Sequence, residues 1–451
     1  MRVAVLGAGV TGLVAALRLA QRGHEPVVLE RWPGLGGQAA TFDVGGGHRL
    51  EHYYHHWFTS DRHVVSLCEE LGVQVDWLPS SVGFFADGGL HPFTSPLDLL
   101  RFRPLPLTAR VRMGLAVVRL QRGDSTAIDH EHETAATWVR REMGSAAWER
   151  VWGPLMRGKF GDRAEDVSMA WLHGKLTQRR QVRGREARRE QLGYPPASFE
   201  ALFAALDSAI RAAGGEVRID APAARVERAA AGGFDVTSGS PGSWREGHDP
   251  RAFPMAGAPE HFDAVIATVP NDVFAALAGA IVDDDLLARA ASIDMHTALC
   301  LLLEVDRRVT PFYWTNVADP AVPFVGVVEH TNLVPAERYD GRRFLYLANY
   351  VAPGDPLLEH DADSLLATYE PALRHVAPGW DRAWVRERWL FREPAAQPIV
   401  DVGYRERIPP MATGVPGLVL ANTTQIWPED RGTSYSVRLG EQAVDVLLGG
   451  E

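Results

Sequence analysis

A glycine motif close to the start of the chain places the strongest limit on what it can fold into. Gly7 to Gly12 read Gly-Ala-Gly-Val-Thr-Gly and match the pattern GxGxxG. The apolar run at residues 2–6 predicts a buried parallel strand, and apolar residues at helical spacing in 11–22 predict a helix. A further run at 26–30 predicts the next strand. In such a unit the glycines permit a tight turn, a close approach of a phosphate to the backbone and close packing of the helix. The sequence therefore predicts a Rossmann-type βαβ unit that binds a dinucleotide.

The residues around this motif supply the expected cofactor contacts. Glu30 ends the second predicted strand 18 residues after Gly12, where a carboxylate can accept hydrogen bonds from ribose hydroxyls. The helix N-terminus offers backbone N–H groups and a partial positive charge to the phosphates. A second glycine pair in 31–38 lets the backbone pass close to a long dinucleotide. The predicted contacts in this part of the chain are Gly7, Gly9, Val10, Thr11, Gly12, Glu30, Arg31, Gly36, Gly37 and Gln38.

With this motif and its glycine pair, the first fifty residues resemble the FAD-dependent amine oxidase superfamily, which includes protoporphyrinogen oxidase, phytoene-type desaturases and monoamine oxidases. In that family the Gly-Gly pair usually stands between two arginines. Here Gln38 replaces the second one, which we expect to weaken one phosphate or flavin contact. The resemblance implies FAD as cofactor. It also implies an α/β fold with a Rossmann-type FAD-binding domain and an inserted α+β substrate domain.

Four later segments extend the resemblance in the family's order. Residues 42–48 resemble the segment that runs beside the flavin ring, and 224–227 resemble the strand whose backbone pairs with adenine. Residues 263–270 resemble the strand that re-enters the FAD domain, and 417–422 resemble its last strand, with Asn422-Thr423 in place of the usual Gly-Asp. Residues 431–436 would begin the helix that points at the flavin pyrimidine edge. The resemblance implies further cofactor contacts at Gly46, Gly47, His48, Val226, Asn422, Arg431, Ser434 and Tyr435.

The cysteines bear on how the cofactor is held. No cysteine follows Cys300, so the C-terminal cysteinyl–flavin bond of monoamine oxidases is impossible and non-covalent FAD is expected. No second GxGxxG follows a predicted strand, which argues against a separate NAD(P)H domain. Two cysteines, Cys68 and Cys300, in 451 residues favour a reducing cytoplasm, and neither has a nearby metal-ligand partner.

The length of 451 residues favours two domains. We expect a discontinuous FAD-binding domain at 1–80, 195–295 and 396–451, and a substrate domain with a helical insert at 81–194 and 296–395. Residues 216–219, 225–227 and 234–237 alternate like strands of one small sheet. No apolar run reaches the length of a membrane span. The net charge of −11 argues against nucleic acid or an anionic membrane as the main partner, although a local basic patch can override this average.

The stretch from about 96 to 189 is helical in pattern and ends in an arginine cluster. Such a cluster is either a solvated helix face or mobile loop, or a site for a substrate that carries phosphate or carboxylate. Its members are Arg179, Arg180, Arg183, Arg185, Arg188 and Arg189.

Two groups of residues are candidates for the substrate side. The segment 51–61 is rich in histidine and aromatic residues, and Tyr54, His55 and His56 either line the active-site cleft or belong to a structural aromatic cluster. Its spacing does not favour a metal site, so none is predicted. Glu329 and His330 end a predicted strand, where they either contact substrate or are surface polar residues.

The predicted function is that of an FAD-dependent oxidoreductase which transfers a hydride from a small molecule to FAD. Amine oxidases of the family carry a lysine on the strand near Thr297 that holds a water at the flavin, and this chain has no lysine there, which puts an amine oxidase in doubt. Two alternatives remain. One is a redox-neutral sugar mutase, since 51–61 faintly resembles a region of UDP-galactopyranose mutase; the other is a non-catalytic FAD-binding scaffold. A sugar, a nucleotide-linked compound and a lipid all remain open as substrate, and the electron acceptor and oligomeric state are also open.

Overall fold

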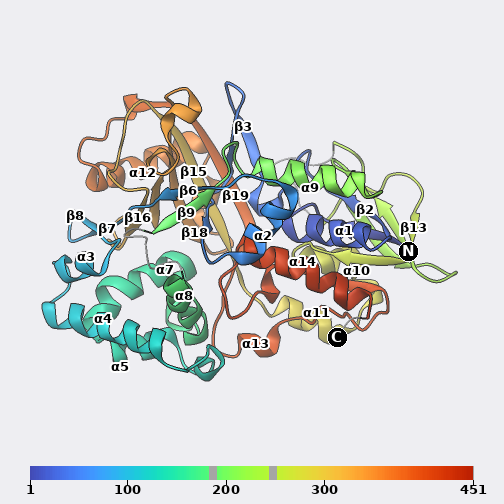
Figure 1. Ribbon diagram of the computed structural model, residues 1–451, viewed down its shortest axis with the longest axis horizontal. Helices are drawn as coiled ribbons and strands as arrows, with labels where there is room; N and C mark the ends of the chain where they lie inside the picture. The colour runs from blue at the N-terminus through green and yellow to red at the C-terminus, as the bar shows by residue number, and fades with distance from the viewer. Residues whose placement is uncertain (182–189, 243–250, 450–451) are drawn as a thin grey trace.

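A computed structural model describes residues 1–181, 190–242 and 251–449. Two β-sheets of different kinds lie beside one another, with a helical region against the second (Figure 1). The first sheet has five strands in the order β10-β2-β1-β14-β20, and the second has seven in the order β19-β15-β18-β17-β16-β7-β8. The predicted α/β class with an α+β second region is confirmed.

The five-stranded sheet is parallel and covered on both faces. Its strands are β1 (Arg2–Leu6), β2 (Glu25–Leu29), β10 (Glu216–Arg218), β14 (Ala264–Ala267) and β20 (Leu418–Leu420). Three helices lie side by side on one face (Figure 1): α1 (Val10–Gln21), α9 (Glu200–Ala212) and α14 (Thr433–Leu447). Burial on both faces explains why these strands read as continuous apolar runs.

The other face of this sheet is covered by a small antiparallel sheet and a helix, namely β11 (Ala223–Arg228), β12 (Phe234–Ser238), β13 (Glu260–Phe262) and α10 (Asn271–Ala278). The prediction that 216–219 belongs to this small sheet was wrong. The structure places β10 parallel to β2, because it follows α9 directly and completes a crossover connection back to the first sheet.

The seven-stranded sheet forms the second region. Its strands are β7 (Val82–Ala86), β8 (Gly89–Pro92), β15 (Met295–Val305), β16 (Trp314–Val317), β17 (Gly326–Glu329), β18 (Arg343–Val351) and β19 (Val385–Pro398). Strand β15 pairs antiparallel with both β18 and β19, and α12 (Ala362–Val376) packs on the sheet. The exact domain boundaries given above remain a prediction.

Short strands join the two regions. The hairpin of β3 (Thr41–Gly45) and β4 (His48–Glu51) leads into β5 (Trp57–Phe58) and α2 (Arg62–Leu71). Strand β9 (Gln191–Tyr194) lies between β5 and β6 (Asp76–Pro79) in a three-stranded sheet.

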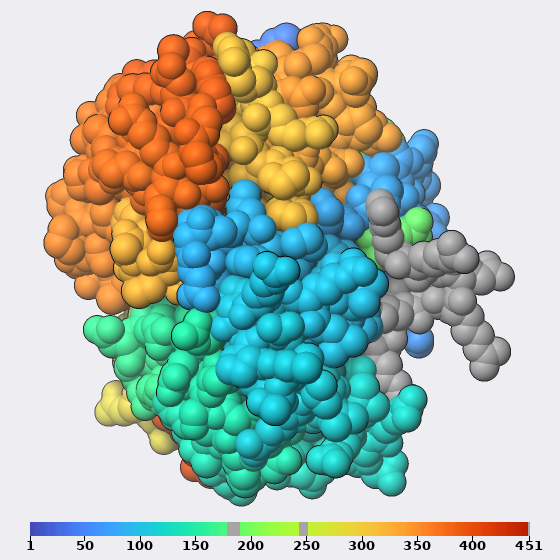
Figure 2. Space-filling model, turned by 90° about the vertical axis from the view of Figure 1, so that its left-hand side faces the viewer, coloured from blue at the N-terminus to red at the C-terminus, as the bar shows by residue number. Residues whose placement is uncertain are grey.

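A helical insert with its own apolar core packs against the second sheet. It consists of α3 (Pro96–Arg101), α4 (Leu107–Arg122), α5 (Ala135–Glu142), α7 (Gly153–Phe160) and α8 (Met169–Gln181). This confirms the helical prediction up to Gln181. Figure 2 shows the face formed by α3 and α4 below the second sheet. Of the predicted arginine cluster, Arg183, Arg185, Arg188 and Arg189 and the side chains of Arg179 and Arg180 lie outside the described residues.

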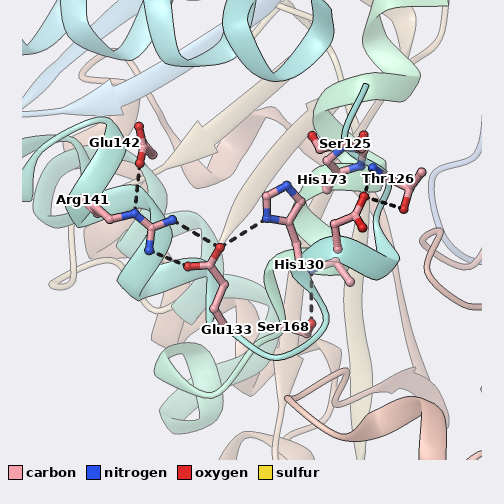
Figure 3. A network of polar contacts seen from close by, with 10 residues as sticks. Ser125, Thr126, His130, Glu133, Arg141, Glu142, Ser168 and His173 are labelled. Atoms are coloured by element: carbon pink, nitrogen blue, oxygen red, sulfur yellow. Dashed lines mark hydrogen bonds and ion pairs between the residues drawn. The ribbon is translucent and has the colours of Figure 1, made fainter. Parts of the chain in front are cut away.

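A polar network holds the loop before α5 onto the insert (Figure 3). Glu133 accepts from Arg141 at 2.7 Å, and the ring of His130 is 3.2 Å from the same carboxylate. The His130 ring stacks on that of His173, whose Nε2 is 3.1 Å from the carbonyl oxygen of Ser125. These contacts are among residues of the insert itself.

Candidate cofactor and substrate site

The glycine motif forms a packed turn between β1 and α1. Gly7 has a φ of +103°, in the left-handed region that favours glycine. A Cβ on Gly12 would lie 2.0 Å from the carbonyl oxygen of Gly7, so a side chain there would push the helix off the strand. Gly9 precedes the helix and offers no side-chain cap. At the beginning of the helix, the N–H groups of Val10 and Thr11 therefore have no side-chain acceptor from the N-cap residue.

The second glycine pair packs directly on this turn. The N–H of Gly36 donates to the carbonyl oxygen of Ala8 at 2.9 Å. A Cβ on Gly37 would lie 3.0 Å from the Cα of Gly9. A Cβ on Gly9 would meet only the Cα of Gly37, at 3.9 Å. The two glycine segments are separated in sequence by α1 and β2. They pack together and form one backbone cradle.

Glu30 closes the cradle at the carboxyl end of β2. Its side chain is buried, with Oε2 accepting from the N–H of Ala8 at 2.6 Å and Oε1 accepting from that of Trp32 at 2.9 Å. Burial raises the pKa of Glu30. Each carboxylate oxygen can accept more than one hydrogen bond, so these contacts are compatible with a further donor such as a ribose hydroxyl. Arg31 follows, half-buried, with its guanidinium 6.0 Å from the ring of Trp32.

The far end of the cradle reaches the second sheet. Gln38 Nε2 donates to the carbonyl oxygen of Ala395 in β19 at 2.7 Å. Two residues further along that strand, Gln397 Oε1 accepts from Arg431 Nε at 3.0 Å. Arg431 also donates to the hydroxyl of Tyr350 at 2.7 Å and lies over its ring at 5.5 Å. The ends of β18 and β19 and the residues just before α14 therefore meet around Arg431.

The aromatic segment before β5 faces the same junction. Tyr54 interacts with the hydroxyl of Tyr350 and packs edge-on against Trp314, with 4.6 Å between ring centroids. Burial raises the pKa of Tyr54 well above its ordinary value. Tyr54 and Arg431 therefore share Tyr350 as a partner. That this segment lines an active-site cleft stays a prediction.

The two histidines that follow are neutral at pH 7. His55 Nδ1 lies 2.6 Å from the carbonyl oxygen of Tyr53, and His56 Nδ1 lies 2.9 Å from the hydroxyl of Tyr313. Burial lowers the pKa of His55 to about 4 and that of His56 to about 3. Each ring can offer or accept a hydrogen bond, but neither supplies a positive charge.

Glu329 and His330 have the contacts of buried structural groups. Glu329 accepts from the N–H groups of Val309 and Thr310, the latter at 2.6 Å, and burial raises its pKa to about 7. His330 Nε2 lies 2.7 Å from the hydroxyl of Tyr339. These contacts tie the end of β17 to neighbouring loops, and they do not join either residue to Arg431.

Gly46, Gly47 and His48 lie at the exposed tip of the β3–β4 hairpin, which projects at the top of Figure 1. His48 Nε2 is 2.8 Å from Asp340, and Arg342 donates to the backbone of the turn at Gly45. The structure therefore places the predicted flavin-side segment beside the turn before β18. It does not bring these three residues together with the glycine cradle.

The remaining predicted contacts occupy varied positions. Val226 lies in β11, an edge strand of its sheet. Asn422 is buried, and its amide donates to the carbonyl oxygen of Val269 at 3.0 Å and to Asn271 at 2.8 Å. Ser434 is buried in the first turn of α14, and Tyr435 follows it, half-buried.

Sequence reasoning missed a charged cluster at the start of α14. Asp430 Oδ2 lies 2.5 Å from Lys159 Nζ in α7 and 2.5 Å from Lys175 Nζ in α8. The ring of Trp171 lies beside both ammonium groups, and its Nε1 donates to Asp430 Oδ1 at 3.3 Å. The missed signal was the rarity of lysine in an arginine-rich chain.

Two general findings concern the described residues as a set. Within 1–181, 190–242 and 251–449, no three His, Cys, Asp or Glu side chains gather as they would around a metal ion. None of the helices in these ranges has the length and apolar character needed to cross a membrane.

Fold and cradle together define a flavoprotein of the Rossmann type. The chain belongs to the family of flavin-containing amine oxidoreductases, whose model matches residues 10–429. This confirms the resemblance drawn from the glycine segments, and it makes the chain a member of a family of flavin-dependent oxidoreductases. The cradle fits a dinucleotide, because side chains are excluded where it packs and the backbone at Gly9 stays open.

Relatives of known name match only part of the chain. A 15-cis-phytoene desaturase of Synechococcus elongatus is 27% identical over 158 residues, which cover 32% of this chain and 33% of that protein. The mitochondrial protoporphyrinogen oxidase of Nicotiana tabacum is 25% identical over 181 residues, covering 37% and 34%. The matched segment thus spans about a third of the length of these curated relatives.

Solved structures are similar over nearly the whole chain. Reduced UDP-galactopyranose mutase superposes with a TM-score of 0.72 at 15% identity and covers 99% of this chain and 95% of its own. A triple mutant of putrescine oxidase superposes with a TM-score of 0.71 at 16% identity, covering 99% and 98%. At these identities the likeness shows the fold alone.

Proposed function

We propose that this protein binds FAD non-covalently and transfers a hydride from a small-molecule substrate to it. The observation that carries the proposal is the backbone cradle, in which Gly9 and Gly37 meet beside the buried carboxylate of Glu30. Among the described residues, a Cβ on Gly9 would meet only the Cα of Gly37, at 3.9 Å, and the adjacent helix N-terminus lacks a side-chain cap. Such a site suits a pyrophosphate better than any protein group.

The two ends of the cradle have different proposed roles. Glu30 and the edge strand that carries Val226 would hold the adenosine, and the N-terminus of α1 with Arg31 would hold the phosphates. Gln38 and Arg431 would lie towards the flavin, because both contact the end of β19. Ser434 and Tyr435 would contribute the first turn of α14 at that end.

When bound, oxidised flavin is the group that accepts a hydride from a substrate carbon. The protein's own contribution is charge and exclusion of water. Arg431, next to the N-terminus of α14, places positive charge where negative charge would develop. Tyr54, His55 and His56 supply neutral hydrogen-bonding groups, and we call these three side chains the aromatic wall. His55 and His56 are unsuited to act as acids at pH 7, since burial lowers the pKa of both.

The substrate is proposed to be a small molecule, with a lipid, a sugar and a nucleotide-linked compound as candidates. Named relatives include a phytoene desaturase and a protoporphyrinogen oxidase, which supports oxidation of a C–H bond. A redox-neutral mutase reaction is the competing outcome. The two buried free thiols, Cys68 and Cys300, support the expectation of a reducing cytoplasm.

The test is an anaerobic absorption spectrum of the FAD-loaded protein before and after addition of polyenes, amines, sugars and nucleotide sugars. Bleaching of the oxidised flavin band by one candidate is the expected result and identifies the substrate class. If no candidate bleaches the band but the dithionite-reduced protein isomerises a sugar, the protein is a redox-neutral mutase and the hydride-transfer proposal is wrong. A protein that takes up no FAD contradicts both.

A further inference from the structure

The chain contains only two lysines, and the ammonium groups of both contact the same carboxylate oxygen. Of its 46 Lys plus Arg residues, only Lys159 and Lys175 are lysines. Their Nζ atoms are each 2.5 Å from Asp430 Oδ2, although one lysine comes from α7 and the other from α8. Since arginine serves as the cation everywhere else in the sequence, composition does not account for this pairing.

An ammonium group suits this position for a geometric reason. It is compact and has three rotatable donors, so two ammonium groups can share one oxygen and each keep further N–H groups. A guanidinium would use its planar fork on both carboxylate oxygens. Here the second oxygen of Asp430 accepts from Trp171 Nε1 at 3.3 Å, so both carboxylate oxygens already have a donor. The lysines retain donors that Asp430 does not take.

The positive charges at this site exceed the negative ones. Arg431 follows Asp430 in the sequence and is a third cation, close enough to affect the pKa of Lys159. Its two hydrogen-bond partners are a glutamine and a tyrosine, both neutral. The neighbouring Glu429 is paired with Arg438 through two contacts of 3.0 and 3.1 Å.

One other acid interacts with Arg431 more weakly. Burial raises the pKa of Glu393, and the charge of Arg31 lowers this pKa more than that of Arg431 does. Within the part of the chain that the structure describes, Asp430 is the one acid paired with either lysine.

Two of these charges are largely withdrawn from water. The side chains of Asp430 and Lys159 are 9% and 19% exposed, and that of Lys175 is 34% exposed. Partly buried cations are costly unless an anion balances them. Burial, together with the charges of Lys175 and Arg431, lowers the pKa of Lys159 to about 7 despite its contact with Asp430. An additional anion would relieve this excess of positive charge.

We propose that Lys159, Lys175 and Arg431 form a binding site for an anionic group of the substrate, either a phosphate or a carboxylate. The inference rests on the proposed function and narrows its substrate class. Arg431 links the cluster to Tyr350, the residue that Tyr54 also contacts, so the anionic end of the substrate would lie beside the aromatic wall. A purely apolar polyene would leave this site without a partner.

The experiment is a calorimetric titration of the FAD-loaded protein with sulfate, as a probe for phosphate, and separately with acetate, as a probe for carboxylate, at constant ionic strength. Wild type is expected to bind one of the two at one site. Lys175→Gln should weaken that binding about tenfold, because it removes one charge-assisted hydrogen bond. Lys175→Arg keeps the charge but not the ammonium geometry, so it should weaken the binding less. Asp430→Asn should tighten it, because it removes the competing carboxylate. That gain is not expected from a site whose only role is to join the helices.

Two controls keep the outcomes distinct. Arg289→Gln removes an exposed positive charge that pairs with Asp285, and it should leave the titration unchanged. Bound FAD and thermal unfolding are measured for every variant before titration, so loss of flavin counts against the proposed function and not against the anion site. The inference is overturned if wild type binds neither probe, or if a folded, FAD-loaded Lys175→Gln binds it as wild type does. Should Asp430→Asn fail to fold, the comparison of Lys175→Gln with Lys175→Arg decides.

Discussion

The carboxylate of Glu30 accepts a hydrogen bond from the backbone N–H of Ala8, with 2.6 Å between Oε2 and the nitrogen. This contact joins the end of β2 to the middle of the glycine motif. The residue expected to hold the ribose therefore also fixes the turn expected to hold the phosphates. Its second oxygen accepts from the N–H of Trp32, so a change at Glu30 removes the acceptor of two backbone N–H groups at once.

Replacing Glu30 with alanine should release FAD on gel filtration and lower the free energy of unfolding by about 2 kcal/mol, because buried N–H groups lose their acceptor. Flavin absorbance per chain and urea denaturation measure the two effects. Glu25→Ala, at the exposed start of the same strand, is the matched control and should keep its FAD. Full FAD occupancy in Glu30→Ala would remove Glu30 from the cofactor site.

Gly12→Ala should destabilise the protein by about 3 kcal/mol and abolish FAD binding, because the new Cβ would lie 2.0 Å from the carbonyl oxygen of Gly7. Gly34→Ala provides the control within the neighbouring glycine-rich segment, since a Cβ there meets nothing within 4 Å. Denaturant midpoints and flavin content distinguish the two variants. Equal behaviour would mean that the tight packing of α1 on the turn is not required.

The glycine segments show how far the sequence could predict this fold. The glycine spacing together with the flanking apolar runs identified the βαβ unit, because Gly7 and Gly12 are required by backbone packing, which is a local property. The position of β10 was missed, because alternation in a three-residue strand does not reveal which sheet it joins.

The substrate side was harder to predict for the same kind of reason. The cluster of Lys159, Lys175 and Asp430 depends on three segments that meet only in the folded chain. The hairpin tip at Gly46 reads like a cofactor segment, yet its contacts are set by the distant turn at Asp340.

Glu329→Gln should change stability and its pH dependence without changing FAD content. Burial raises the pKa of Glu329 to about 7, so its stabilising contribution is present below the unfolded-state pKa near 4.5 and is lost as the pH rises through 7. The wild-type free energy of unfolding should therefore fall between pH 5 and 8, and the fall should be shallower in Glu329→Gln. Denaturation at three pH values checks this, with the exposed Glu337→Gln as control. An unchanged slope would show that Glu329 does not titrate in this range.

Sulfate affinity should decrease as the pH rises from 6 to 9. Lys159 faces Asp430, Lys175 and Arg431, and its lowered pKa of about 7 means that it loses its charge within this range in the absence of an anion. Sulfate itself keeps its charge, so calorimetry reports the protein group. Lys159→Gln should bind sulfate weakly at every pH. A wild-type affinity that is constant with pH would show that Lys159 stays charged or does not contact the anion.

The most direct test of the account is the stoichiometry and attachment of flavin in the purified protein after incubation with FAD. The protein is passed through a desalting column, its absorption spectrum is recorded, and it is then precipitated with acid. We expect about one flavin per chain, recovered intact as FAD in the supernatant, because the cradle is proposed to hold a dinucleotide and no cysteine follows Cys300 in the sequence. A desalted, folded protein without a flavin band would contradict the central claim, and flavin retained in the pellet would contradict its non-covalent form.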